Sequence, residues 1–177
     1  VMGLPSERVY AEQHTGSYSA LLGKSSASEP VNVSSSSFGP SYSPDIISTN
    51  DGTTHVIWTE EDTIGICWIY YRNWNLDGSL SPVEGISNVG DQCYYSSIVA
   101  DTDGTVHVSW LQTISGLSHV YYRQRDANGN WSEIEDVAST DYASSQPHLA
   151  SNGNGKAYLV WNDKENDEDV LLFSERD

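Results

Sequence analysis

Basic residues are scarce in this sequence. Its 177 residues include 8 lysines and arginines against 25 aspartates and glutamates, so the formal net charge is −17 at pH 7. Nucleic acids and anionic membranes are bound through a positively charged surface, and we therefore expect neither as a partner. The acidity is compatible with cation binding, and equally with solubility alone.

Long hydrophobic runs and apolar aromatics are scarce as well. No apolar stretch approaches the roughly 18 residues of a transmembrane helix, so the sequence predicts no membrane insertion. Phenylalanine occurs twice and methionine once, whereas there are 11 tyrosines and 6 tryptophans. Aromatic side chains with a polar tip, together with few helix formers, favour an all-β protein.

One short pattern occurs three times in the chain. A turn glycine is followed by a strand-like run that ends in Trp58, Trp110 or Trp161. The copies are about 50 residues apart, a period that indicates propeller blades or a similar array of β units.

Each copy predicts four strands, and this sets the expected domain organisation. The whole chain, 1–177, reads as one β segment. It divides into a closing region with an outer strand (8–34), two blades (42–88 and 94–139) and an incomplete blade (145–174). The incomplete blade lacks its fourth strand.

Two repeated positions call for a local explanation. Pro44 and Pro147 are expected to open their strands, because the first residue of a strand can lack a ladder donor. His55, His107 and Tyr158 share one position, which favours an aromatic hydrogen-bonding partner inside the sheet over a metal ligand.

The turn at 123–132 resembles the Asp box of sialidase-like (BNR-repeat) β-propellers. Asp126 and Trp131 keep the separation found in that motif, although Gln124 replaces its serine and Gly129 is shifted by one residue. The resemblance implies an all-β propeller segment of about three four-stranded antiparallel blades, completed by another chain or by missing blades. It identifies the architecture better than the function, because propellers host enzymes, lectins and scaffolds alike.

Most of the distinctive aromatics are expected to be structural. Trp58, Trp110 and Trp161 recur at equivalent strand ends and are predicted to wedge between blades. Within the Asp box, Asp126 and Trp131 are predicted to pin the turn.

The candidate ligand residues lie elsewhere. Trp74 has no aromatic counterpart in the other repeats and is the better surface candidate. The acidic run supplies Asp163, Glu165, Asp167 and Asp169. These carboxylates could hold Ca²⁺, but the spacing of an EF-hand is missing, and a solvated run of charge is the simpler interpretation. No other cofactor or metal is indicated.

The resemblance also implies a test for catalysis. A sialidase of this kind would need three arginines that grip a carboxylate, a Tyr–Glu nucleophile pair and an acidic aspartate. Arg72 and Arg123 are repeat-equivalent and are expected on the face opposite the family's active site. No arginine triad or catalytic carboxylate pair can be recognised, so we expect no enzymatic activity.

The sequence therefore predicts a non-catalytic binding or assembly module, extracellular or on the cell surface, with a carbohydrate or protein ligand. One alternative is a fragment of a sialidase-like glycoside hydrolase. Another is a structural component of a surface layer or filament.

Cys67 and Cys93 are predicted to form a disulfide, with Cys93 in a loop, which fits an oxidising compartment. As a partner we expect a second copy of the chain or the remaining blades of the same protein. Val31 to Ser34 could supply the outer strand that the strand from Val170 to Ser174 lacks, and two chains would then close a six-bladed ring.

Overall fold

The computed structural model describes residues 29–35, 39–88, 92–138 and 143–177. The chain divides into two units, residues 1–32 and 33–177, and the fold described below belongs to the second. Of the predicted closing region, 8–28 lies outside the described residues. Within the described part, no helix is long and apolar enough to cross a membrane.

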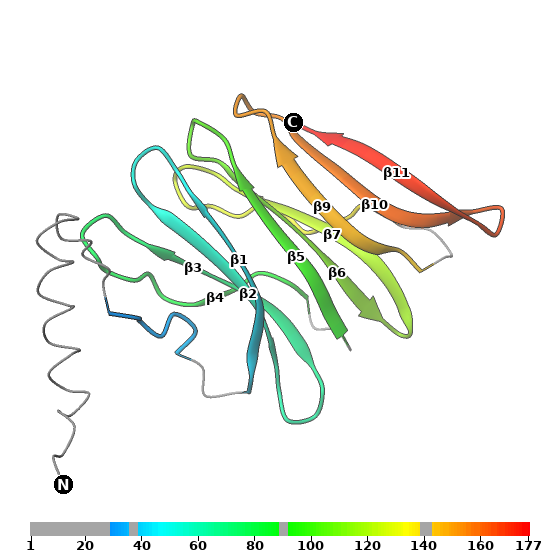
Figure 1. Cartoon of the computed structure of the whole chain (residues 1–177), viewed down its shortest axis with the longest axis horizontal. Coiled ribbons are helices and arrows are strands. Elements are labelled where there is room, and N and C mark those ends of the chain that lie inside the picture. Colours follow the sequence, from blue (N-terminus) through cyan, green and yellow to red (C-terminus); the bar gives the residue numbers. More distant parts are fainter. Residues whose placement is uncertain (1–28, 36–38, 89–91, 139–142) are drawn as a thin grey trace, which may run out of the picture. The chain divides into compact units, whose positions relative to one another are not determined.

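Three antiparallel sheets follow one another along the chain (Figure 1). The first contains β1 (Ser41–Ser48), β2 (Thr54–Glu61), β3 (Cys67–Trp74) and β4 (Glu84–Gly85). The second contains β5 (Gln92–Ala100), β6 (Val106–Ile114), β7 (Leu117–Arg125) and β8 (Glu135–Asp136). The third contains β9 (Ser145–Ser151), β10 (Ala157–Glu165) and β11 (Glu168–Arg176).

Each sheet is a simple up-and-down meander, and the first strands of neighbouring sheets lie next to each other. β1 contacts β5, and β5 contacts β9. Successive four-stranded meanders whose first strands adjoin are the arrangement of propeller blades. The prediction of an all-β propeller segment is confirmed, and the sheets are called the first, second and third blades from here on.

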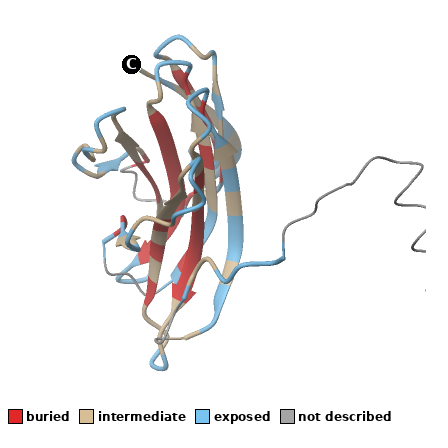
Figure 2. Cartoon of the chain, turned by 90° about the vertical axis from the view of Figure 1, so that its left-hand side faces the viewer, coloured by how far each residue is buried: buried red, intermediate tan, exposed pale blue. Residues whose placement is uncertain are grey.

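The core lies between the blades. One buried cluster joins Ile57, Ile69 and Tyr71 of the first blade to Val108 and Trp110 of the second. A smaller cluster joins the second blade to the third. β6 is buried along nearly its whole length, and Figure 2 shows buried strands in the middle of the view with exposed segments on either side. Burial on both faces explains why these strands do not alternate between apolar and polar residues.

The inner strands share a repeated bulge that the sequence did not reveal. Ser43, Tyr95 and Gln146 all have positive φ, and the strand register shifts at each of these positions. Pro44 and Pro147 follow such a residue inside their strands, so the expectation that proline opens the strand was wrong. A bulge leaves its extra residue without a ladder bond, and a residue without an N–H fits there.

Candidate functional site

The acidic run 163–169 forms the hairpin between β10 and β11, and its first member is not at the surface. Asp163 is buried and accepts hydrogen bonds from the indole Nε1 of Trp161 (3.1 Å) and from Ser144 Oγ (2.9 Å). Its carboxylate is thus occupied by internal donors. The expectation that Asp163 belongs to a solvated run of charge was wrong, whereas its role as a ligand residue stays a prediction.

The remaining carboxylates of this run are exposed but do not converge. Asn166 and Asp167 form the two-residue turn, both with positive φ, which is the geometry of a type I′ hairpin. Glu165 pairs with Glu168 across the strands, whereas Asp169 pairs with Lys164, one register position along. Because successive pairs point to opposite faces of a sheet, the carboxylates separate.

Calcium coordination needs several oxygen ligands around one point. Among the described residues, no group of three or more histidine, cysteine or acidic side chains could hold a metal ion. A shallow cavity of about 340 Å³ adjoins the hairpin. It is lined by Ala143, Ser145, Asn162, Asp163, Lys164 and Asp169.

Trp74 lies far from the acidic hairpin in the repeat. It is the last residue of β3 and pairs with Thr54, the first residue of β2, whereas the hairpin lies where β10 ends and β11 begins. Trp74 and the acidic hairpin therefore lie at opposite ends of the strands within the repeat. Trp74 is half-buried and forms a β-bridge with Leu80 across the turn that follows it.

A polar cleft of about 290 Å³ opens between the first and second blades. It lies at the same end of the strands as Trp74. Its walls come from the turns that follow β1 and β5 and from the turn at 126–131. It includes Thr49, Asp51, His55, Asn73, Asp103, Arg125 and Asn128. No ligand role was predicted from the sequence for any of these residues.

His55 and Arg125 give this cleft its electrostatic character. Burial, reinforced by the Arg125 guanidinium, lowers the pKa of His55 to about 4. The neutral ring is held by Tyr71 Oη at 2.6 Å from Nδ1 and by Thr49 Oγ1 at 3.2 Å from Nε2. Its hydrogen bonds are thus directed inward, consistent with the expected role inside the sheet.

The second blade repeats this arrangement with a carboxylate. His107 lies between Tyr122 Oη (2.7 Å) and Asp101 Oδ2 (3.1 Å), and both His107 and Asp101 are buried. Burial opposes ionisation of Asp101, but hydrogen bonds from Ser151 and His107 outweigh it and lower the pKa of that carboxyl. In the third blade, the histidine and the tyrosine are replaced by Tyr158 and Phe173, whose rings stack on each other.

The repeated tryptophans have a partner that sequence inspection missed. The indole N–H of each donates to the side chain two residues later. The pairs are Trp58 with Glu60 (3.0 Å), Trp110 with Gln112 (3.0 Å) and Trp161 with Asp163 (3.1 Å). The signal in the sequence was an acceptor two positions after every repeated tryptophan.

The turn at 126–131, which was compared with an Asp box, is held by hydrogen bonds to Asp126. The side-chain amide of Asn130 donates to Asp126 Oδ2 (3.0 Å), and this bond, with the backbone N–H groups of Asn130 and Asn128 that donate to Oδ1, lowers the pKa of the Asp126 carboxyl. Trp131 donates to Glu84 of the first blade (2.8 Å) and packs edge-on against Tyr71. Both residues stabilise structure, within the turn and between blades.

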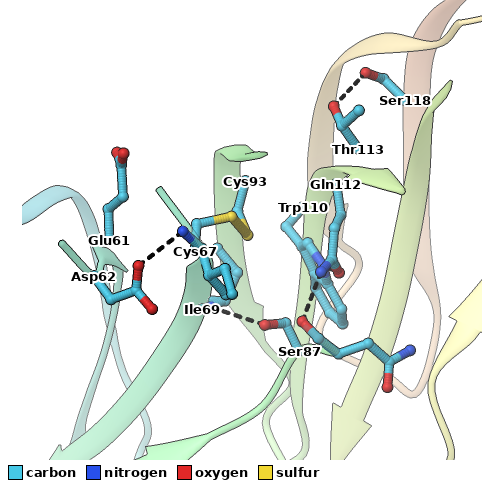
Figure 3. Close-up of a disulfide and its surroundings, with 12 residues drawn as sticks. Glu61, Asp62, Cys67, Ile69, Ser87, Cys93, Trp110, Gln112, Thr113 and Ser118 are labelled. Carbon is cyan, nitrogen blue, oxygen red and sulfur yellow. Dashed lines mark hydrogen bonds between the residues drawn. A yellow bond between two sulfur atoms is a disulfide. The ribbon is translucent and has the colours of Figure 1, made fainter. Parts of the chain in front are cut away.

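The two cysteines also join the first two blades. Cys67 of β3 and Cys93 of β5 form a disulfide (Figure 3). Cys93 lies in the inner strand itself, and its expected position in a loop was wrong.

Two equivalent arginines link the first and second blades to the segment that precedes each of them. Arg123 Nη1 donates to the carbonyl of Ile86, which follows β4 of the first blade (3.2 Å). Arg72 Nη1 donates to the carbonyl of Val33 (2.9 Å) in the same way. Val33 thus occupies, relative to the first blade, the position that an outer strand of a preceding blade would have.

No protein-family model matches the sequence, and neither does any curated protein. Among solved structures, one similar to this chain is the crystal structure of an endo-arabinase from Bacteroides thetaiotaomicron. The TM-score is 0.48 and the identity 11%, over 76% of this chain and 55% of the other. The chain spans about half the length of that protein.

The two outward faces of the propeller segment are unlike the faces between its blades. On the third blade, Leu171 and Phe173 are 70% and 62% exposed, whereas their equivalents Ile69 and Tyr71 in the first blade are fully buried. On the opposite face of the first blade, Ile46 is 61% exposed. Positions that form the core elsewhere in the repeat are therefore open to solvent at both ends.

Proposed function

We propose that the chain is a non-catalytic propeller module of the sialidase-like, Asp-box type, and that its function is assembly. The observation that carries this proposal is the exposure of Leu171 and Phe173 at positions where the first blade buries Ile69 and Tyr71. Exposed apolar residues at core positions mark a surface that a partner covers. The module thus contributes blades to a larger propeller.

The arrangement of the arginines supports a role without catalysis. Recognition of a substrate carboxylate needs free guanidinium groups. Arg72 and Arg123 bind backbone carbonyls, while Arg125 lies over the ring of Tyr71 and Arg176 over that of Tyr122. Arg123, Arg125 and Arg176 therefore contact the preceding blade, and Arg72 contacts the segment that precedes the first blade.

An extracellular or cell-surface location belongs to the same proposal. It is supported by the disulfide between Cys67 and Cys93, because structural disulfides persist in oxidising compartments. A glycan or protein ligand on the assembled propeller would be held by loops rather than by the interfaces between blades.

Sedimentation velocity on the 177-residue chain tests the proposal. We expect association beyond the 19.5 kDa monomer at micromolar concentration. In parallel, fluorogenic sialosides and arabinosides should not be hydrolysed above the rate of buffer alone, and a glycan array would identify a carbohydrate ligand. A folded 19.5 kDa monomer at every concentration would contradict the assembly role, and turnover of a glycoside would contradict the absence of catalysis.

A further inference from the structure

Equivalent residues can be matched across the blades by strand register. Tyr71, Tyr122 and Phe173 each pair with the residue that precedes a repeated tryptophan. Trp74, Arg125 and Arg176 likewise share one position, three residues further along the third strand. The contacts inside the segment therefore predict the contacts that its two open faces would make.

Inside the segment, each interface places a cation over a tyrosine of the preceding blade. Arg125 lies 5.1 Å from the ring of Tyr71, and Arg176 lies 5.8 Å from the ring of Tyr122. At the open faces both members of the pair are changed: Phe173 replaces the tyrosine and Trp74 replaces the arginine. The two substitutions match each other, because an aromatic pair replaces a cation–aromatic pair.

The contact made by Trp131 also has an apolar equivalent at the open faces. Trp131 packs edge-on against Tyr71 across the interface between the first two blades, with 5.1 Å between ring centroids. Leu80 has the equivalent position in the first blade, since Trp74 and Leu80 form the same bridge as Arg125 and Trp131. Leu80 would meet Phe173 as Trp131 meets Tyr71.

The hydrogen bonds between an outer segment and the third strand can be matched in the same way. Ile86 donates its N–H to the carbonyl of Ile69, and Ser87 Oγ accepts the N–H of Ile69. The equivalent of Ile69 is Leu171, on β11, which no outer strand covers among the described residues. The equivalents of Ile86 and Ser87 are Val33 and Ser34, held by Arg72 in the same manner.

We propose that a second copy of this chain covers these faces. The third blade of each copy packs against the first blade of the other, with Val33 and Ser34 added to the edge of β11 and Trp74 and Leu80 packed on Phe173. Two segments of three blades make a ring of six, within the roughly 4–8 blades that propellers contain. This inference rests on the proposed assembly function and specifies its partner.

Cysteine trapping tests the pairing directly. Val33→Cys and Leu171→Cys are made in separate chains, which are mixed and oxidised; the native cysteines are already paired with each other. Directly opposed residues of an antiparallel pair have Cα atoms about 5.5 Å apart, which suits a disulfide. We expect a covalent dimer in the mixture, in several-fold excess over either variant alone. Equal cross-linking in the mixture and in the single variants would overturn the proposed contact.

The matched control is Val33→Cys mixed with Glu175→Cys. Glu175 lies on the same edge strand but about 13 Å further along, and it should not cross-link. Cross-linking as efficient as with Leu171→Cys would indicate random collision and contradict the proposal. Unchanged circular dichroism of each variant establishes that it is folded.

The double variant Val33→Cys/Leu171→Cys tests ring closure. A closed ring of two chains yields covalent dimers only, whereas a ladder of higher multiples would overturn closure in favour of an open filament. A disulfide within one chain would overturn the second copy as the occupant.

Phe173→Asp supplies a measurement without cross-linking. It should raise the dimer dissociation constant by about tenfold or more, because buried aromatic anchors dominate interfaces. Ile64→Asp, in the exposed turn between β2 and β3, should leave that constant unchanged. If the wild-type chain associates but none of these variants behaves as stated, the second-copy geometry fails while the assembly function stands.

Discussion

At the scale of single residues, the three repeated tryptophans donate their indole N–H groups to three different acceptors. Glu60, Gln112 and Asp163 accept from their tryptophans at nearly equal distances, although two are acidic and one is an amide. What the repeat preserves is an oxygen in the right place, since a buried indole N–H needs a partner. The charge of the acceptor is secondary.

Trp110→Ala should lower the free energy of unfolding by about 3–5 kcal/mol. Trp110 is fully buried between the first two blades, so the substitution leaves a cavity and also removes the donor to Gln112. Urea denaturation measures the loss. Ile64→Ala, at an exposed position, is the control and should change stability by less than about 0.5 kcal/mol. An equally small effect of Trp110→Ala would mean that the indole does not stabilise the interface.

His55 should make the fold sensitive to mild acid. Burial lowers its folded pKa to about 4, so between pH 4 and about 6.5 the unfolded chain binds more protons and stability falls as the pH falls. Allowing for solvent screening at the cleft, the loss between pH 7 and pH 5 is about 1–2 kcal/mol. His55→Gln should remove this part of the pH dependence. Parallel pH profiles for both proteins would contradict the assignment.

At the scale of elements, the disulfide ties a third strand to the next inner strand. Cys67 and Cys93 are 26 residues apart in sequence, and their Cα atoms are 5.7 Å apart. Their disulfide joins β3 to β5. The first and second blades are therefore linked covalently, by hydrogen bonds and by shared apolar contacts. Among the described residues, no disulfide joins the second blade to the third, and beyond the backbone these two blades are held by apolar contacts and hydrogen bonds.

The double variant Cys67→Ala/Cys93→Ala should lose about 3.5 kcal/mol, the chain-entropy estimate for a loop of this length. Guanidinium denaturation would measure the loss, and mass spectrometry of native protein should find no free thiol. Two free thiols in native material would contradict both the bridge and the proposed extracellular location.

Much of this arrangement of strands could be predicted from the sequence. The glycine-to-tryptophan pattern locates β2, β6 and β10, because a turn followed by a β-rich run with a large aromatic is a strong local signal. The phase of the same repeat also predicted that the third sheet has three strands among the described residues. Local patterns carry this information because each blade is built from neighbouring segments.

The remaining features depend on contacts that sequence spacing does not encode. Asp163 was interpreted as part of an acidic surface run, because its charge was more conspicuous than its position two residues after Trp161. The positive φ of Tyr95 could not be foreseen, because tyrosine is not a residue type that favours this conformation. Likewise, the correspondence of Trp74 with Arg125 requires the strand register.

At the scale of the whole molecule, charge opposes the association that the apolar faces favour. Each chain carries a net charge of −17, so two copies repel each other when they meet. The Debye length shortens from about 10 Å at 0.1 M salt to about 3 Å at 1 M, which screens this repulsion. Assembly should therefore be stronger in saline solution.

Raising NaCl from about 50 to about 500 mM should lower the dimer dissociation constant by about tenfold or more, as measured by sedimentation equilibrium. Replacing NaCl by sucrose at equal osmolality controls for effects of solute exclusion. A dimer that weakens with salt would show that specific ion pairs, and not apolar faces, hold the copies together.

The covalent link between β3 and β5 also sets how far the chain can be stretched. Under a pulling force, each antiparallel meander would peel strand by strand, but the residues between Cys67 and Cys93 would stay closed in their loop. At about 3.5 Å per extended residue, this withholds on the order of 90 Å of contour length until the bond is reduced. An oxidised and a reduced molecule would thus differ in reach by that amount, and the disulfide acts as a mechanical stop between the first two blades.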